Sequence, residues 1–349
     1  MNVEAIDDIT GRYQISTGVR KEDLESLAIN DQVKTIQFSH PLSLGEIEML
    51  EALVFSRRKD IMLRVYGYDN QICNLSFLNK VPSLRRFSAD CLSQAKGIES
   101  VAELKYLELL GVGIYNLDSF DFLDKITPNL KELYLYRTES KKPDISGISR
   151  FFQLEKLYLE RHQRGIDSLR DLKDLKEITL HSISTPNLDY LSDLPALWSV
   201  AIKLGGIKAF DSLKHIPNLK SLELWHVRGL NDLSFLTELY ALQRLSLESL
   251  NKITSFPDMS GLKSLRRIGL SDMKGLANLD SLKNCPALED FSFYSARNFT
   301  PEQIVPVLEN STVKNVACRF GSDKKNTSFE QLAAAYHKST KIERFQPKQ

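Results

Sequence analysis

Histidine and cysteine are the residues best suited to metal binding or nucleophilic catalysis, and in this sequence their spacing supports neither. No two of the six histidines lie four residues apart, and none belongs to an HExxH sequence. The sequence also lacks a CxxC pair, a GxxxxGK[S/T] phosphate-binding loop and a GxSxG nucleophile motif. We therefore expect no catalytic residue, no metal site, no cofactor and no enzymatic activity.

Tyrosine and glutamate recur at alternate positions of short apolar segments. Two such segments are LKELYLYR, which starts at Leu130, and LEKLYLER, which starts at Leu154. Residues two apart point to the same face of a β-strand, so the aromatic and charged members of each segment would share one face. Such a face can bind another molecule through aromatic contact area.

These segments belong to a repeat that runs through most of the chain. The repeat has the pattern L-x-x-L-x-L, and its middle apolar residue marks each copy: Ile36, Leu63, Phe87, Leu107, Leu133, Leu157, Ile178, Val200, Leu222, Leu245, Ile268, Phe291 and Val316. The mean spacing is about 23 residues, within the range of about 20–29 for leucine-rich repeats. We predict one short parallel strand at each marker, with the marker buried.

The sequence resembles the leucine-rich repeat family over residues 33–320. A second apolar ladder with a spacing of three, as in Leu233, Leu236, Leu239 and Leu242, is similar to that of the short-repeat, internalin-like type. The resemblance implies an α/β fold, a right-handed solenoid or horseshoe with a parallel concave β-sheet and short helices or 3-10 turns on the convex side. The family usually places asparagine a few residues after each strand. Here those positions hold other residues, so we expect an apolar spine instead: Thr138, His162, Ile183, Gly205, Val227, Leu250 and Met273.

The ends of the repeat array need caps, because each repeat buries its leucines only against its neighbours. We assign residues 1–32 to an N-terminal cap, 33–320 to the array and 321–349 to a C-terminal helical cap. Thr300, with proline next and Gln303 three residues on, matches a helix start with a capping box. Ser328 matches a second helix start.

The charge balance excludes some classes of partner. Lysine plus arginine number 46 and aspartate plus glutamate 45, so a net charge of +1 creates no strong field for nucleic acid or anionic lipid. The four cysteines are widely spaced, which is typical of a reducing compartment. The sequence has no apolar run of signal-peptide or membrane-span length. We expect a cytoplasmic chain, with no nucleic-acid and no membrane partner.

Because side chains alternate along a strand, the sequence shows which residues of each repeat lie on the exposed face of the sheet. Corresponding positions of successive strands form columns on this face. For the repeats at Leu107, Leu133, Leu157 and Ile178 the columns hold Tyr106, Glu108 and Leu110; Glu132, Tyr134 and Tyr136; Lys156, Tyr158 and Glu160; and Glu177, Thr179 and His181. Tyr134 and Tyr158 share a column, so we expect their rings to lie side by side. Four glutamates against Lys156 give these four repeats a charge of −3 with His181 neutral. Alternatively, tyrosine and threonine simply favour strands and the charges keep a large face soluble.

Trp198 occupies the position just before a strand, which in other repeats holds mostly charged residues. We expect its indole to be largely exposed at the rim of the sheet. There it either contacts a partner or lies over the stems of Lys176 and Lys220. The candidate partner-binding residues are Tyr106, Glu108, Glu132, Tyr134, Tyr136, Tyr158, Glu160, His181, Trp198 and Trp225.

The sequence predicts a monomeric, non-enzymatic protein–protein interaction module. Its concave face would bind a protein partner that presents basic and apolar groups. An intracellular immunity, inhibitor or adaptor role fits this prediction. The alternatives are a regulatory subunit of an enzyme such as a phosphatase, and a secreted effector.

Overall fold

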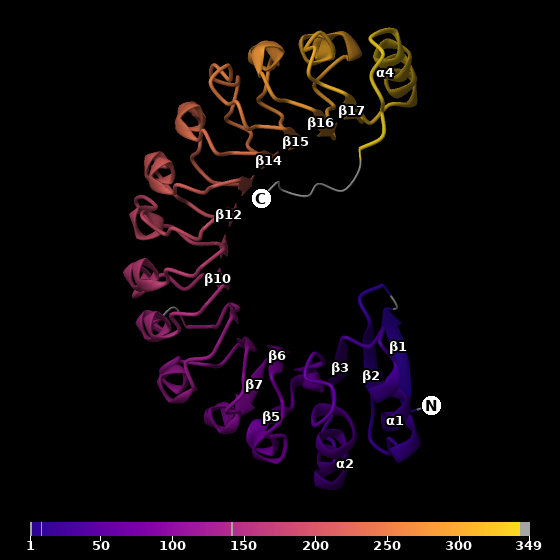
Figure 1. Cartoon of the computed structure of the whole chain (residues 1–349), viewed down its shortest axis with the longest axis vertical. Coiled ribbons are helices and arrows are strands. Elements are labelled where there is room, and N and C mark those ends of the chain that lie inside the picture. The colour runs from indigo at the N-terminus through magenta and orange to yellow at the C-terminus, as the bar shows by residue number, and fades with distance from the viewer. Residues whose placement is uncertain (1, 8, 141, 343–349) are drawn as a thin grey trace. The chain divides into compact units, whose positions relative to one another are not determined.

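The computed structural model describes residues 2–7, 9–140 and 142–342. The chain forms two compact units, Met1–Leu175 and Lys176–Gln349, called the N-terminal and C-terminal units below. Within each unit the strands line one side and short helices and 3-10 turns line the other, as Figure 1 shows. The last residues of the predicted C-terminal cap, 343–349, lie outside the described residues.

The N-terminal unit is built on a sheet with one strand for each repeat. Its strands, in spatial order, are β1 (Val3–Asp7), β2 (Arg12–Ile15), β3 (Thr35–Phe38), β4 (Met62–Tyr66), β6 (Arg86–Leu92), β8 (Leu109–Ile114), β9 (Glu132–Leu135) and β10 (Lys156–Glu160). Only β1 and β2 pair antiparallel among these strands. A separate parallel pair joins β5 (Ile72–Asn74) to β7 (Gln94–Lys96).

Short helical segments return the chain from one strand to the next in this unit. The α-helices are α1 (Lys21–Ile29) and α2 (Leu44–Leu50), and α2 continues into a π-helix at Glu51–Phe55. The 3-10 segments are Tyr68–Asn70, Leu75–Lys80, Ile98–Glu103, Asp121–Lys125, Ser146–Arg150 and Ile166–Asp171. The predicted short returns are confirmed.

The C-terminal unit has a parallel sheet of the same kind. Its strands, in spatial order, are β11 (Glu177–His181), β12 (Ser199–Lys203), β13 (Ser221–Trp225), β14 (Arg244–Glu248), β15 (Arg267–Ser271), β16 (Asp290–Tyr294) and β17 (Asn315–Cys318). Its helices are α3 (Val305–Leu308), α4 (Asp323–Ala335) and 3-10 segments at Asp189–Leu191, Asp211–His215, Ser234–Glu238, Asp280–Asn284 and Pro301–Ile304. Thr300 and Gln303 form the predicted capping box. The predicted helix start at Ser328 is wrong, because α4 begins after Ser322, whose hydroxyl caps it.

The marker residues are all buried, and all but one lie in strands. Leu107 is buried but precedes β8, and the strand register places Leu110 opposite Phe87 and Leu133. Leu110 is therefore the marker of this repeat, and the predicted register is wrong there by three residues. With this correction the spacing between Phe87 and Leu133 is even, since Leu110 lies midway.

The position that usually carries asparagine holds buried residues of several kinds. Ile183 and Met273 are fully buried, as an apolar spine requires. His162 is also buried, and its Nε2 lies 2.9 Å from the carbonyl oxygen of Tyr136. Asn298, two residues beyond this position in its own repeat, donates to the carbonyl oxygen of Leu276 at 3.0 Å. One asparagine thus bonds the preceding turn, as the family pattern implies, but from a displaced position.

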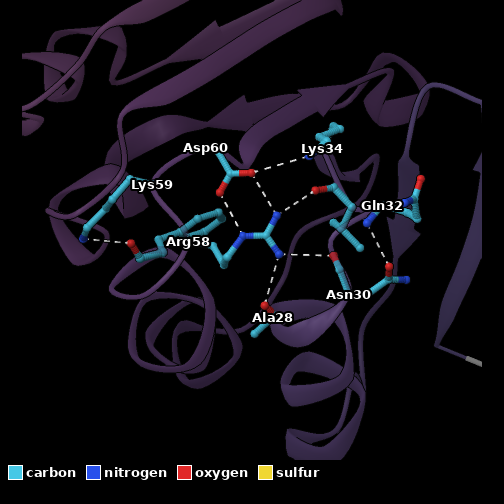
Figure 2. Close-up of polar contacts among 9 residues, drawn as sticks. Ala28, Asn30, Gln32, Lys34, Arg58, Lys59 and Asp60 are labelled. Atoms are coloured by element: carbon cyan, nitrogen blue, oxygen red, sulfur yellow. Dashed lines mark hydrogen bonds and ion pairs between the residues drawn. The ribbon is translucent and has the colours of Figure 1, made fainter.

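Arg58 ties helix α1 to the start of β4, as Figure 2 shows. Its guanidinium donates to the carbonyl oxygens of Ala28, Asn30 and Val33 at 3.2, 3.1 and 3.2 Å. Asp60 holds the same guanidinium through Nε and Nη2 at 2.8 and 2.9 Å. A helix end leaves carbonyl groups without helical partners, and a cation there also interacts favourably with the helix dipole. Arg58 therefore satisfies the Ala28 carbonyl in the last turn of α1 and two carbonyls of the segment that follows the helix.

Candidate partner-binding face

The sheet face of the N-terminal unit is formed by strand side chains that point away from the core. On β9 and β10, Tyr134 pairs in register with Tyr158, as predicted. Their ring centroids are 6.4 Å apart with a 30° interplanar angle, and Tyr136 lies 5.2 Å from Tyr158. All three side chains are half-buried, so the expectation of adjacent rings is confirmed and a cluster of three tyrosines covers two strands.

The tyrosine hydroxyls of this cluster remain protonated over the physiological range. Burial, and next the hydrogen bond to Glu132, raises the pKa of Tyr134. Burial raises the pKa of Tyr136 and of Tyr158 as well. The cluster therefore offers uncharged phenol groups together with aromatic surface.

The corrected register of β8 changes the predicted site. Tyr106 is 62% exposed but lies in the turn before β8, so it is not on the sheet face. Glu108 lies just before the strand, and Leu110 points into the core with no exposed surface. The sheet-face residues of β8 are instead Leu109, Gly111 and Gly113.

The acidic charge predicted for this region is neutralised by arginines of β6 and the turn before it. Arg85 Nη1 lies 2.8 Å from Glu108 Oε1, and Arg86 Nη2 lies 3.1 Å from Glu132 Oε1. Glu177 belongs to the C-terminal unit. The count of −3 is therefore wrong as a description of this face, because it omitted the neighbouring repeat that supplies both arginines.

A cavity of about 1100 Å³ opens on this face of the N-terminal unit. Its lining includes residues from three neighbouring strands: Ser88 and Asp90 of β6, Leu109, Gly111 and Gly113 of β8, and Tyr134 and Tyr136 of β9. The two glycines have no side chain, so the middle strand forms a floor between taller neighbours. A Cβ at Gly111 would lie 2.6 Å from Ser88 Oγ, and one at Gly113 would lie 3.2 Å from the Tyr136 ring.

A hydrogen-bonded network covers the next part of the face, over β2, β3, β4 and β6. Arg64 donates to Asp90 Oδ2 and Gln37 Oε1, both at 2.9 Å, and its guanidinium lies 4.5 Å from the centroid of the Tyr66 ring. Gln37 and Tyr66 both donate to Gln14 Oε1, at 3.1 and 2.9 Å. Burial opposes the charge of Asp90, but the hydrogen bonds from Arg64 and Ser88 outweigh it and lower the pKa of Asp90. Sequence reasoning missed this network, although polar residues at alternate positions of β3 and β4 are its visible signal.

The remaining candidate residues lie in the C-terminal unit. His181 and Trp225 are in one sheet-face column with Lys203 between them, and both side chains are half-buried. Lys203 Nζ lies 2.8 Å from Glu223 Oε1. Trp198 does lie just before its strand, where its backbone accepts from Lys220. Its indole is half-buried, so the expectation that it is largely exposed is wrong.

Within the described residues, no group of three or more histidine, cysteine, aspartate or glutamate residues is arranged to hold a metal ion. None of the helices in that part of the chain has the length and apolar character needed to cross a bilayer. The four cysteines are all free, and Cys91 is the exposed one of the four.

Comparison with solved structures identifies the fold. The structure of a TLR13–ssRNA13 complex contains a chain that matches 88% of this one with a TM-score of 0.57 and 17% sequence identity. Each repeat also contributes one parallel strand and one short return, so the structure and the match indicate the same fold. The chain has the leucine-rich repeat fold.

The leucine-rich repeat match is to part of a larger protein, because the aligned region covers 46% of the TLR13 chain. A leucine-rich repeat protein of Leptospira interrogans, LIC12759, also aligns, over 91% of this chain and 97% of its own, with 12% identity and a TM-score of 0.45. No protein-family model matches the sequence, and no curated protein matches it.

Proposed function

We propose that this leucine-rich repeat chain is a protein-interaction module, and that the sheet face of its N-terminal unit binds a protein partner. The observation that carries the proposal is the cluster of Tyr134, Tyr136 and Tyr158 at the side of a glycine-floored cavity. Tyrosine buries a large area at low entropic cost and is enriched at the centres of interfaces. An inhibitor, immunity or adaptor role fits this proposal, because each requires only a binding face.

The chemistry of the face supports a partner with apolar and hydrogen-bonding groups at the centre of contact. Glu108 and Glu132 already have arginine partners, so a basic group on the partner would compete with Arg85 and Arg86. The Trp198, His181 and Trp225 positions of the C-terminal unit are proposed as further contact residues. A protein fits better than nucleic acid, because the net charge is only +1. A cytoplasmic location is part of the proposal, supported by four free cysteines.

Replacement of Tyr158 by alanine should weaken partner binding by about 2 kcal/mol, or roughly 30-fold in Kd, because its ring contacts both other tyrosines. The measurement is titration calorimetry with a partner obtained by affinity capture, using wild-type and variant columns side by side. Proteins retained by the wild type are the candidates to purify, whether or not Tyr158→Ala also retains them.

Tyr240→Ala is the matched control, because Tyr240 is 65% exposed and lies in the turn before β14 rather than in a strand. It should retain the partner with wild-type affinity. Equal affinity of all three proteins, each with a wild-type circular dichroism spectrum, would contradict the proposed binding face.

A further inference from the structure

A buried histidine is bonded to the backbone of the tyrosine cluster. His162, in the turn after β10, is 1% exposed, and its Nε2 lies 2.9 Å from the carbonyl oxygen of Tyr136. A carbonyl oxygen only accepts hydrogen bonds, so Nε2 carries the proton, and in the neutral ring Nδ1 holds the lone pair. Within the residues that the structure describes, the buried Nδ1 atom has no hydrogen-bond partner.

The surroundings of this ring favour its neutral form. The centroid of the Phe120 ring lies 4.8 Å from that of the imidazole, with an interplanar angle of 79°. A second proton would place a charge away from water and create a buried N–H donor without an acceptor, and both are costly. Burial accordingly lowers the pKa of the His162 imidazole below its ordinary value of 6.5.

Two charged neighbours in the chain act on His162 in opposite directions. Glu160, at the end of β10, favours the imidazolium, and Arg161 opposes it. The phenol of Tyr136 is uncharged, because burial raises its pKa. The charged residues that adjoin Phe120 and Tyr136 in the chain are exposed: Asp121 and Arg137. Burial is therefore the largest influence on the protonation of the ring.

The turn after β10 can open without breaking a strand. Residues 161–165 lie between β10 and the next 3-10 segment, outside regular secondary structure. Arg161 has left-handed backbone with φ of 68°, which is unfavourable for a residue other than glycine. The Arg164 carbonyl accepts from Ile145 N at 3.0 Å, and the Arg164 guanidinium forms an exposed ion pair with Asp144 at 3.2 Å. Exposed ion pairs add little stability, so local opening costs less than unfolding of the sheet.

We propose that His162 makes the tyrosine cluster sensitive to acid. In mildly acidic solution a proton from the solvent adds at Nδ1, the turn after β10 opens to hydrate the imidazolium, and the bond to the Tyr136 carbonyl is lost. Tyr136 then leaves its position against Tyr158, so the protein partner binds more weakly. The weaker binding rests on the proposed function, but the opening itself can be tested in the free protein.

Falling pH favours the open form, because its hydrated ring binds a proton more readily than the buried ring does. The ratio of open to closed protein rises by up to about tenfold for each pH unit below 6.5. Above that pH the ring is neutral in both forms, so the closed form keeps its full advantage.

The test in the free protein follows the His162 ring by NMR in the isotope-labelled full chain, from about pH 7.5 to about pH 5. The nitrogen shifts of the ring distinguish a protonated from an unprotonated Nδ1. We expect the pH midpoint of His162 protonation to lie below that of histidine in the urea-unfolded chain. The amide resonance of Tyr136 should change with the same midpoint, because the two residues are bonded.

The second measurement uses His162→Gln, whose side-chain amide can still donate to the Tyr136 carbonyl but takes up no proton in this pH range. Titration calorimetry gives the partner Kd near pH 7 and near pH 5. The ratio of Kd in acid to Kd at neutral pH should be at least about threefold larger for the wild type than for His162→Gln. His40→Gln is the matched control, because His40 is exposed and lies in the same unit, and it should keep the wild-type ratio.

A midpoint at or above that of the unfolded chain, or a Tyr136 amide that does not follow the ring, would overturn the inference. Equal Kd ratios for the wild type and His162→Gln would overturn it too, while weaker binding by Tyr158→Ala would keep the proposed binding face. If Tyr136 follows the ring and Tyr158→Ala binds normally, the acid opening stands and the proposed binding face is wrong. If His162→Gln does not fold, the NMR measurement on the wild type decides.

Discussion

The Leu222→Ala variant should have a free energy of unfolding about 2–5 kcal/mol below that of the wild type. Leu222 has no exposed surface and lies on β13 between Val200 and Leu245 of the adjacent strands. Truncation leaves a cavity that neighbouring repeats cannot close, because each repeat is held only by its neighbours. The measurement is urea denaturation followed by tryptophan fluorescence. It reports on the C-terminal unit, since both tryptophans of the chain, Trp198 and Trp225, lie there.

Tyr240→Ala is the control for this substitution, because Tyr240 is 65% exposed and lies in the C-terminal unit that the tryptophans report on. It should change stability by less than about 1 kcal/mol. A loss below about 0.5 kcal/mol for Leu222→Ala would show that the residue is not part of the packed core.

The second large effect is expected for Arg58→Ala, with a loss of about 3 kcal/mol in the free energy of unfolding. The variant leaves the carbonyl oxygens of Ala28, Asn30 and Val33 without their donor and Asp60 without its main partner. Arg58→Lys should recover only part of the loss, because an ammonium group cannot reproduce the planar set of donors. Arg57→Ala, at the exposed neighbouring position, serves as control and should be close to wild type.

The pH dependence gives an independent check on Arg58. Its hydrogen bond lowers the pKa of Asp60 to about 2 from 3.8. A carboxyl whose pKa is lower in the folded state stabilises the protein at pH values above its pKa in the unfolded state. This contribution is lost as the pH falls from about 5 toward 2. Because Asp60 is half exposed, the contribution is below about 1 kcal/mol. The difference in the free energy of unfolding between the wild type and Arg58→Ala should therefore become slightly smaller in acid. Equal stability of the two proteins at neutral pH would contradict the role given to Arg58.

The repeat could be predicted from the sequence because each strand carries its own apolar pattern. The failure at β8 has a specific cause. The segment LKYLELLGV fits the pattern in two registers, one with Leu107 in the middle and one with Leu110. Only the spacing to Phe87 and Leu133 distinguishes them, because Leu110 makes both intervals equal.

The glycine floor of the cavity follows from that correction. In the register of Leu107, Gly111 and Gly113 fall outside the three exposed columns, so the glycine floor could not be predicted. The pairing of Tyr134 with Tyr158 needed only adjacent strands in register, and it was predicted correctly.

Other features depend on contacts that one repeat does not contain. Arg86 reaches Glu132 across an intervening strand, and the partners of Arg58 come from three different segments. The residues just after several strands, among them Leu204 and His226 with φ of 55° and 49°, adopt left-handed backbone without glycine. Backbone hydrogen bonds hold them there, as from Leu204 N to Trp225 O at 2.9 Å, and no residue type signals this.

The central claim is that the sheet face of the N-terminal unit binds the partner, and the most direct test is a comparison of tyrosine accessibility in the free and bound protein. Hydroxyl-radical labelling with mass spectrometry measures the modification rate of each tyrosine with and without saturating partner. We expect strong protection of Tyr134, Tyr136 and Tyr158 and an unchanged rate for the exposed Tyr240. Protection of Tyr240 with unchanged rates on β9 and β10 would contradict the account.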